Sequence, residues 1–421
     1  MAQKAIREYF AKKLISQNIP TLNWDYQGIL IDKDTLNDID SLNFNRYVAK
    51  PDQLFGKRGK NGLIFISNSK EDTKIWVSSK LGTKVRVVKN NKDQGVEGIL
   101  THFLIEPAVE HTDEYYLAIK SNRESDTIYF SINGGIDIEE NWDSVTSIDI
   151  PFSLESDNND IAGNISRLIN NVSENNIEQV GDFITQIYNF YKTFAFTYLE
   201  FNPFVVSNGK TIPLDTVARV DSTAAYNLGS LWDGVEFPKP FGSEVSPVEA
   251  EVEKLDAKTG ASLKLTILNP DGQIWLLTAG GGASVIYADT VADLGYIDQL
   301  ANYGEYSGNP STDETEAYCN SLFNAMFTSK AKKKVLIIGG GIANFTDIAA
   351  TFKGIIAAIK KNKAEFINQK IKIFVRRGGP NYQQGLNLIK SEVEKLGITI
   401  EVHGPELHMT RIVKLALESK T

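Results

Sequence analysis

The feature that most limits the possible folds of this chain is a short apolar strand, followed by consecutive glycines and then by a helix. Residues 335–338 are all apolar, which is typical of a buried parallel strand. The glycines at 339–341 permit a sharp turn and a close approach of a ligand to the backbone. Residues 347–363 then carry a helical apolar pattern that ends in lysines. A strand, a glycine turn and an exposed helix N-terminus together form a binding site for an anion.

Two arginines indicate which kind of anion. A dinucleotide-binding sheet should place an acidic residue after its next strand, to accept from a ribose hydroxyl. Here the next strand, 371–375, is followed by Arg376 and Arg377, whose guanidinium groups pair with carboxylates or phosphates. A similar strand-to-glycine turn lies at 274–284. Because such turns share one edge of a parallel sheet, we predict that the three loops bind a small polyanionic metabolite rather than a nucleotide.

Strands and helices alternate from residue 263 to residue 417. This pattern predicts an α/β fold whose C-terminal domain is a doubly wound parallel sheet of the Rossmann or flavodoxin type. The proline- and aromatic-rich stretch 232–247 is typical of a linker before that domain. At the other end of the chain, residues 2–18 have the pattern of one amphipathic helix.

Composition excludes several classes of protein. The formal net charge of -9 argues against general affinity for nucleic acid, and no apolar run is long enough to cross a membrane. Cys319 is the only cysteine, so no internal disulfide can form, and with four histidines a structural zinc site is not expected. A cytoplasmic location is therefore predicted.

The N-terminal half contains two segments suited to a nucleotide. Between residues 47 and 62, basic residues alternate with glycines, and Lys50, Arg58 and the Gly59 backbone have the chemistry to cradle a polyphosphate. A solvated basic hairpin is the alternative. Further along, an apolar strand stops at Pro107, which leaves backbone groups able to pair with an adenine edge. A hinge between subdomains explains that stop equally well.

A hairpin supplies a candidate metal site. The strand 198–206 turns at 207–210 and returns through 212–215, which brings Asn202 close to Asp215. One amide oxygen and one carboxylate suit magnesium when phosphate and water complete its shell. The alternative is structural, with Asn202 capping a turn and Asp215 ending a strand.

Taken together, these segments resemble the ATP-citrate lyase family. The likeness is to the smaller subunit of its two-subunit form and to the first part of the single-chain animal enzymes; the succinyl-CoA synthetase β subunit is a more distant relative. It runs from residue 5 to near the end, and its most distinctive blocks are 50–60, 103–111, 200–204, 255–269, 279–290, 302–308, 339–354 and 374–383.

The resemblance implies a fold and a set of site residues. It implies an ATP-grasp fold of two subdomains, 1–108 and 109–244, followed by a citrate-binding domain, 245–421. It assigns ATP to Lys50, Arg58, Gly59, Pro107, Val109 and Glu114, and Mg²⁺ to Asn202 and Asp215. It assigns citrate to Gly308, Asn344, Thr346 and Arg377. Position 362 is Asn where some relatives carry a tyrosine near citrate, and it receives no role.

The resemblance also implies a reaction and a partner. The family converts citrate, ATP and CoA into acetyl-CoA, oxaloacetate, ADP and phosphate, through a phosphohistidine, citryl-phosphate and citryl-CoA. None of the four histidines stands in the Gly-His-Ala-Gly setting of the phosphorylated residue, and the family's CoA-ligating and citrate-synthase-like regions would lie beyond this chain. No catalytic residue is therefore assigned here. A larger partner subunit is expected to supply the phosphohistidine, most CoA contacts and the cleavage module.

Three alternatives remain at this stage. The small subunit of a citryl-CoA synthetase would share almost every ATP and citrate residue. An NADP-binding oxidoreductase module would use Arg376 and Arg377 to hold the 2′-phosphate. A non-catalytic citrate sensor would keep Arg377 and lose the magnesium pair.

Overall fold

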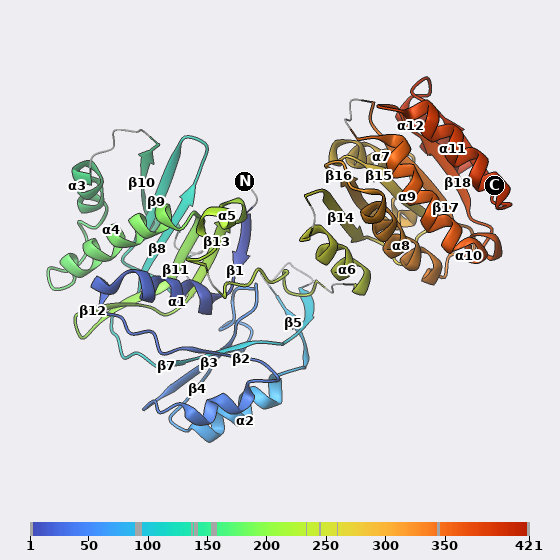
Figure 1. The fold of residues 1–421 in the computed structure, drawn as a ribbon. Helices are drawn as coiled ribbons and strands as arrows, with labels where there is room; N and C mark the ends of the chain where they lie inside the picture. The colour runs from blue at the N-terminus through green and yellow to red at the C-terminus, as the bar shows by residue number, and fades with distance from the viewer. Residues whose placement is uncertain are drawn as a thin grey trace. The chain divides into compact units, whose positions relative to one another are not determined.

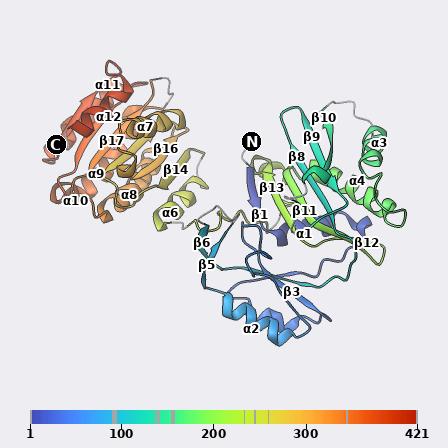
Figure 2. The same ribbon diagram turned by 180° about the vertical axis from the view of Figure 1, so that it is seen from behind.

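The computed structural model confirms the predicted α/β architecture (Figures 1 and 2). It describes residues 3–88, 95–135, 138, 142–152, 158–232, 234–243, 246–258, 260–342 and 346–418. The chain divides into two compact units, Met1–Ser243 and Glu244–Thr421.

The first unit is built around an antiparallel sheet in the order β1-β13-β11-β8-β9-β10, with β12 paired to β11. Its strands are β1 (Gln3–Ile6), β8 (Tyr115–Ser121), β9 (Ser125–Ser131), β10 (Thr146–Pro151), β11 (Phe196–Ser207), β12 (Lys210–Pro213) and β13 (Thr216–Asp221). Helices α1 (Glu8–Asn18), α3 (Asn158–Leu168) and α4 (Ile177–Thr193) pack against it (Figure 1). Short helices complete this part: α5 (Ala225–Leu228) and the 3-10 turns Pro20–Leu22, Trp142–Ser144 and Ser222–Ala224. The 3-10 turn Leu36–Ser41 belongs to the core of the smaller sheet. Aromatic contacts fill the core, and the ring centroids of Phe183 and Phe204 lie 4.8 Å apart.

The first described residues form a strand, which corrects the expectation of one helix over residues 2–18. Gln3–Ile6 pairs antiparallel with β13, so that Ile6 lies opposite Ala218. Helix α1 begins only at Glu8. The Asp52 carboxylate accepts from the backbone N–H groups of Glu8 at 2.9 Å and Tyr9 at 3.0 Å. A distant aspartate therefore satisfies the exposed donors at the start of the helix, which no local pattern announces.

A smaller antiparallel sheet, in the order β2-β7-β3-β4, forms the rest of the first unit. It contains β2 (Ile29–Ile31), β3 (Tyr47–Pro51), β4 (Phe65–Ser67) and β7 (Phe103–Pro107), with helix α2 (Lys70–Lys80) and the hairpin β5 (Lys84–Val87) and β6 (Val96–Ile99) beside it. Phe241 joins the core of this part, although it lies far along the chain. Conversely, β1 and α1 belong to the larger sheet. The predicted subdomain boundary at residue 108 stays a prediction. The first residues of the unit pack with the larger sheet and Phe241 packs with the smaller one, so neither sheet is built from one continuous segment.

The second unit contains a sheet in the order β14-β16-β15-β17-β18-β19, in which β14 is antiparallel to β16 and the other pairs are parallel. The strands are β14 (Ser262–Ile267), β15 (Ile274–Ala279), β16 (Asn302–Ser307), β17 (Val335–Gly340), β18 (Lys372–Arg376) and β19 (Ile400–His403). The helices are α6 (Pro247–Asp256), α7 (Gly281–Asp293), α8 (Thr312–Thr328), α9 (Ile348–Lys361), α10 (Lys363–Asn368), α11 (Tyr382–Lys395) and α12 (Met409–Glu418), with a 3-10 turn at Ile297–Gln299.

Helices cover both faces of this sheet, as predicted for a doubly wound fold. Leu336 and Ile338 pack on the face that carries α8, α9 and α11, while Val335 and Ile337 pack on the face that carries α7 and α12. The continuous apolar run in β17 is explained by burial on both sides. Register pairs link Ala279 with Gly340, so the ends of β15 and β17 meet at one edge.

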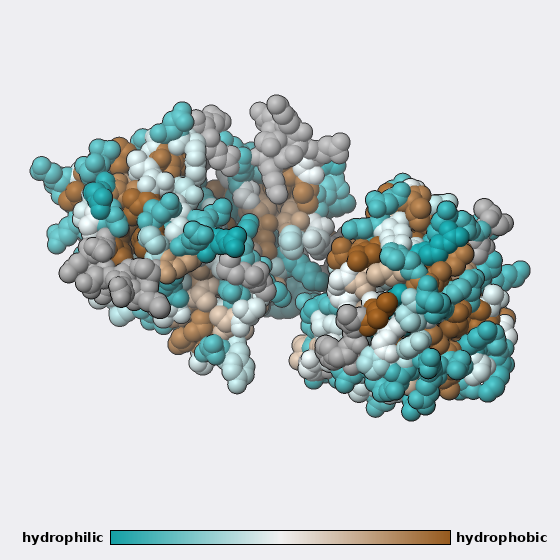
Figure 3. All heavy atoms as spheres, turned by 90° about the horizontal axis from the view of Figure 1, so that it is seen from above, coloured by the Kyte–Doolittle hydropathy of each residue, from teal (hydrophilic) through white to brown (hydrophobic). Residues whose placement is uncertain are grey.

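On the face drawn in Figure 3, hydrophilic residues surround separate apolar patches on each unit. In the part of the chain that the structure describes, no helix combines the length and the apolar character needed to cross a bilayer.

The buried Asp52 carboxyl predicts a pH effect on stability. Burial and the nearby negative charge of Glu8 raise the pKa of Asp52 from 3.8 to about 6. The folded chain therefore holds this proton to higher pH than the unfolded chain, so the contribution of Asp52 to stability falls as the pH rises from about 4 to 6. Asp52→Asn keeps an oxygen for the helix amides and removes the titration. The free energy of unfolding of Asp52→Asn minus that of the wild type, both measured with urea, should increase as the pH rises over this range. A difference that does not change with pH would contradict the raised pKa of Asp52.

Candidate functional site

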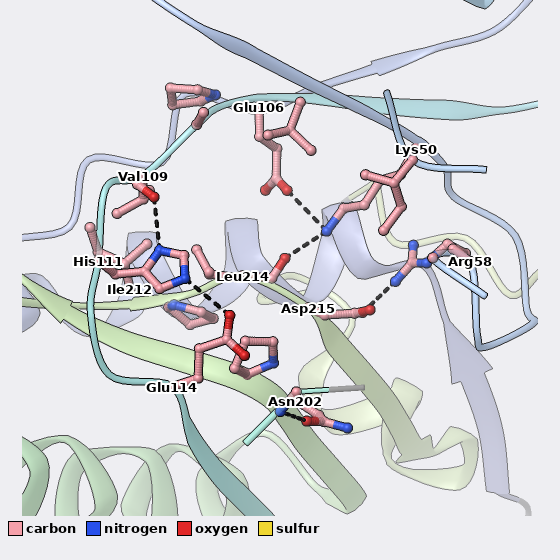
Figure 4. Close-up of a pocket in the computed structure, with 18 of the residues that line it drawn as sticks. Lys50, Arg58, Glu106, Val109, His111, Glu114, Asn202, Ile212, Leu214 and Asp215 are labelled. Carbon is pink, nitrogen blue, oxygen red and sulfur yellow. Dashed lines mark hydrogen bonds and ion pairs between the residues drawn. The ribbon is translucent and has the colours of Figure 1, made fainter. Parts of the chain in front are cut away.

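The first unit contains a cleft of about 1320 Å³ between its two sheets. Strand β3 and the loop after it line one side, β7 and the following hinge line another, and β11 to β13 form the floor (Figure 4). All the residues predicted for ATP and Mg²⁺ line this one cleft: Lys50, Arg58, Gly59, Pro107, Val109, Glu114, Asn202 and Asp215. Their individual roles stay predictions, but segments far apart in sequence meet at one place.

A buried carboxylate organises the cationic side of the cleft. Glu8 lies 2.7 Å from each of the three cations Lys12, Lys50 and Arg58. Glu106 adds a second carboxylate, 2.8 Å from Lys12 and 3.2 Å from Lys50. All five side chains are buried or nearly so. The cations that would face phosphate are thus already fixed by the protein's own carboxylates.

This network shifts the proton affinities of its members. Burial by itself would raise the pKa of Glu8, but the charges of Lys12, Lys50 and Arg58 hold it well below its usual value. Burial likewise would lower the pKa of Lys50, but Glu8 and Glu106 raise it above its usual value. Both groups are therefore charged at neutral pH. Lys50 also donates to the backbone carbonyl of Leu214 at 2.6 Å, which ties β3 to the floor of the cleft (Figure 4).

Asn202 and Asp215 lie side by side, as the hairpin predicted. The Asn202 backbone N–H donates to the Asp215 carbonyl at 3.0 Å, and the Asn202 side-chain oxygen accepts from the Gly135 N–H at 2.7 Å. The Asp215 carboxylate pairs with Arg58. Among the described residues no three His, Cys, Asp or Glu side chains gather closely enough to hold a metal. The pair nevertheless fits Mg²⁺, which commonly takes one or two protein oxygens together with phosphate and water.

The hinge after β7 is shaped by backbone contacts. The Ala108 N–H donates to the Arg46 carbonyl at 2.8 Å, after which the chain leaves the sheet. His111 lies in the next turn, with one ring nitrogen 2.8 Å from the Val109 carbonyl and the other 3.1 Å from the Glu114 carboxylate (Figure 4). As predicted, the strand ends at Pro107, and the residues after it leave the sheet and are held by the contacts of His111.

Arg377 dominates the carboxyl edge of the sheet in the second unit. Its side chain is fully buried, and none of its three guanidinium nitrogens has a hydrogen-bond partner in the described part of the chain. The guanidinium packs against Gly340, where a β-carbon would lie 2.0 Å from one of its nitrogens. Glycine is required there for steric reasons. A buried cation without a partner is costly, so this position calls for an anionic ligand.

Two of the other residues predicted for citrate, Gly308 and Thr346, lie around the same edge. Gly308 follows β16 with φ of +74°, and the fully buried Thr346 comes just before α9. Asn344 lies outside the described residues. Asn362, which received no role, stands at the far end of α9 and donates to Asn320 at 2.9 Å.

Comparisons with known proteins match both units. The family model for the ATP-grasp domain of ATP-citrate synthase matches residues 2–232, and the model for the citrate-binding region of ATP citrate lyase matches residues 243–419. The chain belongs to the ATP-citrate lyase family. It is 44% identical over 427 residues to ATP-citrate synthase alpha chain protein 2 of Arabidopsis thaliana, covering 99% of both chains.

A longer relative and a solved structure also match this family assignment. The chain is 42% identical to the ATP-citrate synthase of Mus musculus, covering 99% of this chain and 38% of the mouse protein. Among solved structures, ATP citrate lyase from Methanothrix soehngenii in complex with citrate and coenzyme A has a TM-score of 0.89 and 44% identity, covering 99% of this chain and all of that one. The ATP-grasp and citrate-binding parts of the family are therefore both present.

The sequence analysis missed several functional groups. Glu8 and Glu106 hold the cations, and Lys12 joins their network, yet the sequence patterns pointed to none of these three residues. One signal was available for two of them: Glu8 and Lys12 are spaced by four residues and lie on the buried side of α1 with Ile15. Charges on an apolar helix face indicate partners elsewhere in the fold.

Removing the Glu8 charge should destabilise the fold. Glu8→Gln leaves Lys12, Lys50 and Arg58 with too few carboxylates, and breaking a buried ion pair in this way costs about 3–5 kcal/mol. Urea unfolding measures the change. Glu174→Gln, at an exposed loop position, is the matched control and should change stability little. Equal effects of the two substitutions would refute the network.

Proposed function

We propose that this chain is the ATP- and citrate-binding subunit of ATP-citrate lyase. It contributes to the conversion of citrate, ATP and CoA into acetyl-CoA, oxaloacetate, ADP and phosphate. The observation that carries the proposal is the fully buried guanidinium of Arg377 without a partner in the described chain, at the edge of a sheet matched by the family's citrate-binding model. A carboxylate ligand supplies the missing charge and accepts the donors.

The cleft of the first unit is proposed to bind ATP. Lys50, Arg58 and the Gly59 backbone face the phosphates, while Pro107 and Val109 border the base and Glu114 the ribose. The Glu8 carboxylate keeps Lys50 and Arg58 in place before the nucleotide arrives, so little side-chain ordering accompanies binding.

Magnesium is proposed at Asn202 and Asp215. When bound there, the ion would offset part of the negative charge of the phosphates. Arg58 contacts one oxygen of the Asp215 carboxylate, so the other oxygen of Asp215 would be left to hold the metal while Arg58 stays beside it. The two groups are thus suited to act together on one Mg-nucleotide.

A larger partner subunit is proposed to complete the enzyme. His102, His111, His403 and His408 all lie outside a Gly-His-Ala-Gly sequence, so the phosphohistidine is expected on the partner, with most CoA contacts. The mouse relative is much longer than this chain, which is consistent with further regions in the complete enzyme. A cytoplasmic location stays a prediction from the single cysteine.

Two alternatives lose support. An NADP-binding module would need Arg376 for the 2′-phosphate, yet Arg376 already donates to the backbone carbonyls of Leu407 at 2.7 Å and Gly340 at 3.0 Å. A citrate sensor would not need the pairing of Asn202 with Asp215 in a nucleotide-sized cleft. A citryl-CoA synthetase subunit would share the same sites, so only the product of the reaction distinguishes it from an ATP-citrate lyase subunit.

Arg377→Ala should weaken citrate binding by about 2–4 kcal/mol, because a buried carboxylate loses its paired donors. Calorimetric titration of citrate measures the loss. Arg411→Ala, at an exposed position of α12, is the control and should bind citrate like the wild type. Unchanged affinity in Arg377→Ala would remove the basis of the citrate site.

Asp215→Asn should abolish magnesium-dependent phosphorylation of the partner histidine and leave citrate binding nearly intact. The substitution removes the carboxylate proposed for the metal, whereas the citrate site lies in the other unit. Phosphate transfer from labelled ATP and citrate calorimetry are measured on the same sample. Asp182→Asn, exposed on α4, serves as the control. If both activities fall together, the division of labour between the units is wrong.

Mixing this chain with the larger subunit of the family should produce ATP- and CoA-dependent oxaloacetate, which neither chain forms alone. A coupled assay of oxaloacetate measures the reaction. Accumulation of citryl-CoA without oxaloacetate would instead indicate a citryl-CoA synthetase, and an inactive mixture would count against both.

A further inference from the structure

Two neighbouring tyrosines in the second unit differ in one respect. Tyr306 on β16 and Tyr318 on α8 are both fully buried, with ring centroids 6.2 Å apart. The Tyr318 hydroxyl donates to the Lys264 carbonyl at 2.9 Å. The Tyr306 hydroxyl has no hydrogen-bond partner in the described part of the chain. A buried hydroxyl without a partner is unfavourable, so its presence needs an explanation.

Tyr306 is aligned across the sheet with Gly340, the residue that the Arg377 guanidinium contacts. Register pairs join Tyr306 to Ala279 and Ala279 to Gly340, and directly paired residues point to the same face. On that face the Arg377 guanidinium packs against Gly340. Tyr306 and Arg377 therefore flank Ala279, which presents only a methyl group between them. Glu305, the next residue along β16, alternates to the other face, where it approaches Gly281.

The state of the hydroxyl suits a donor. Burial raises the pKa of Tyr306 to about 12, although the Arg377 charge acts in the opposite direction. The hydroxyl is therefore protonated at neutral pH and can donate a hydrogen bond to an acceptor. Two strand spacings, about 9.6 Å, separate β16 from β17, so a ligand that meets both Tyr306 and the Arg377 head group needs several oxygens. A compact polycarboxylate meets that requirement.

We propose that the Tyr306 hydroxyl donates a hydrogen bond to an oxygen of the polycarboxylate held by Arg377, and so is a further ligand-contacting residue of this site. The inference rests on the proposed citrate function and adds a residue to it. In this arrangement Arg377 supplies charge, and Tyr306 supplies a second, neutral donor on the opposite side of Ala279. The unpaired hydroxyl is then a feature of binding rather than of folding.

The matched pair of tyrosines provides the test. Tyr306→Phe and Tyr318→Phe each remove one hydroxyl from a fully buried ring in the full-length chain. Citrate affinity is measured by calorimetry and stability by urea unfolding without ligand. Tyr306→Phe should raise the citrate Kd about tenfold and leave the unfolding midpoint unchanged or higher, since it removes an unpaired polar group. Tyr318→Phe should lower the midpoint, because the Lys264 carbonyl loses its donor, and keep the citrate Kd within about twofold.

The outcomes separate this inference from the function on which it rests. If the wild type binds citrate, Arg377→Ala does not, and Tyr306→Phe binds like the wild type, the role of Tyr306 is refuted while the citrate site stands. If Tyr306→Phe loses citrate affinity and stability together, as a packing defect would, the proposed contact is also refuted. If the wild type itself does not bind citrate, the proposed function fails first.

Discussion

Buried charge is the constraint on which both sites depend. A charged side chain removed from water destabilises a fold unless an opposite charge or a set of hydrogen bonds compensates it. The first unit compensates internally, since Glu8 contacts Lys12, Lys50 and Arg58 at 2.7 Å. The second unit leaves the Arg377 guanidinium fully buried with no partner in the described chain. In the proposed function, the first arrangement holds the cations in place for a nucleotide. The second reserves one cation for a small anionic ligand.

Topology explains why these groups meet. In the second unit, parallel pairing places the end of β15 beside that of β17, and β17 beside β18, so the glycine turns and Arg377 share one edge. Gly340 is the point of contact, because only a residue without a β-carbon leaves room for the guanidinium. In the first unit the floor of the cleft comes from one hairpin, where Asn202 bonds to the backbone of Asp215. Antiparallel register thus brings together the two residues proposed for magnesium, as parallel register brings together those proposed for the anion.

Much of this was predictable from the sequence, for identifiable reasons. The doubly wound domain followed from the apolar run 335–338, whose burial on both faces leaves no alternation. The hairpin at 207–210 predicted the approach of Asn202 to Asp215. The roles of individual ATP and citrate residues rest on the family resemblance, and the structure adds only that they lie together. The features that could not be predicted depend on strand pairing between residues far apart in the sequence. Residues 3–6 form a strand only because β13 is available to them, and Tyr306 lies near Arg377 only through the register of β16 and β15.

Whether the second unit binds citrate is tested by a calorimetric titration of the purified chain with citrate, with succinate and NADP as parallel ligands. Citrate should bind saturably, and the other two ligands much more weakly or not at all, because the buried Arg377 and the proposed Tyr306 donor suit a compact polycarboxylate. Binding of succinate as tight as that of citrate would favour a succinyl-CoA synthetase type of site. Saturable NADP binding without citrate binding would contradict the account.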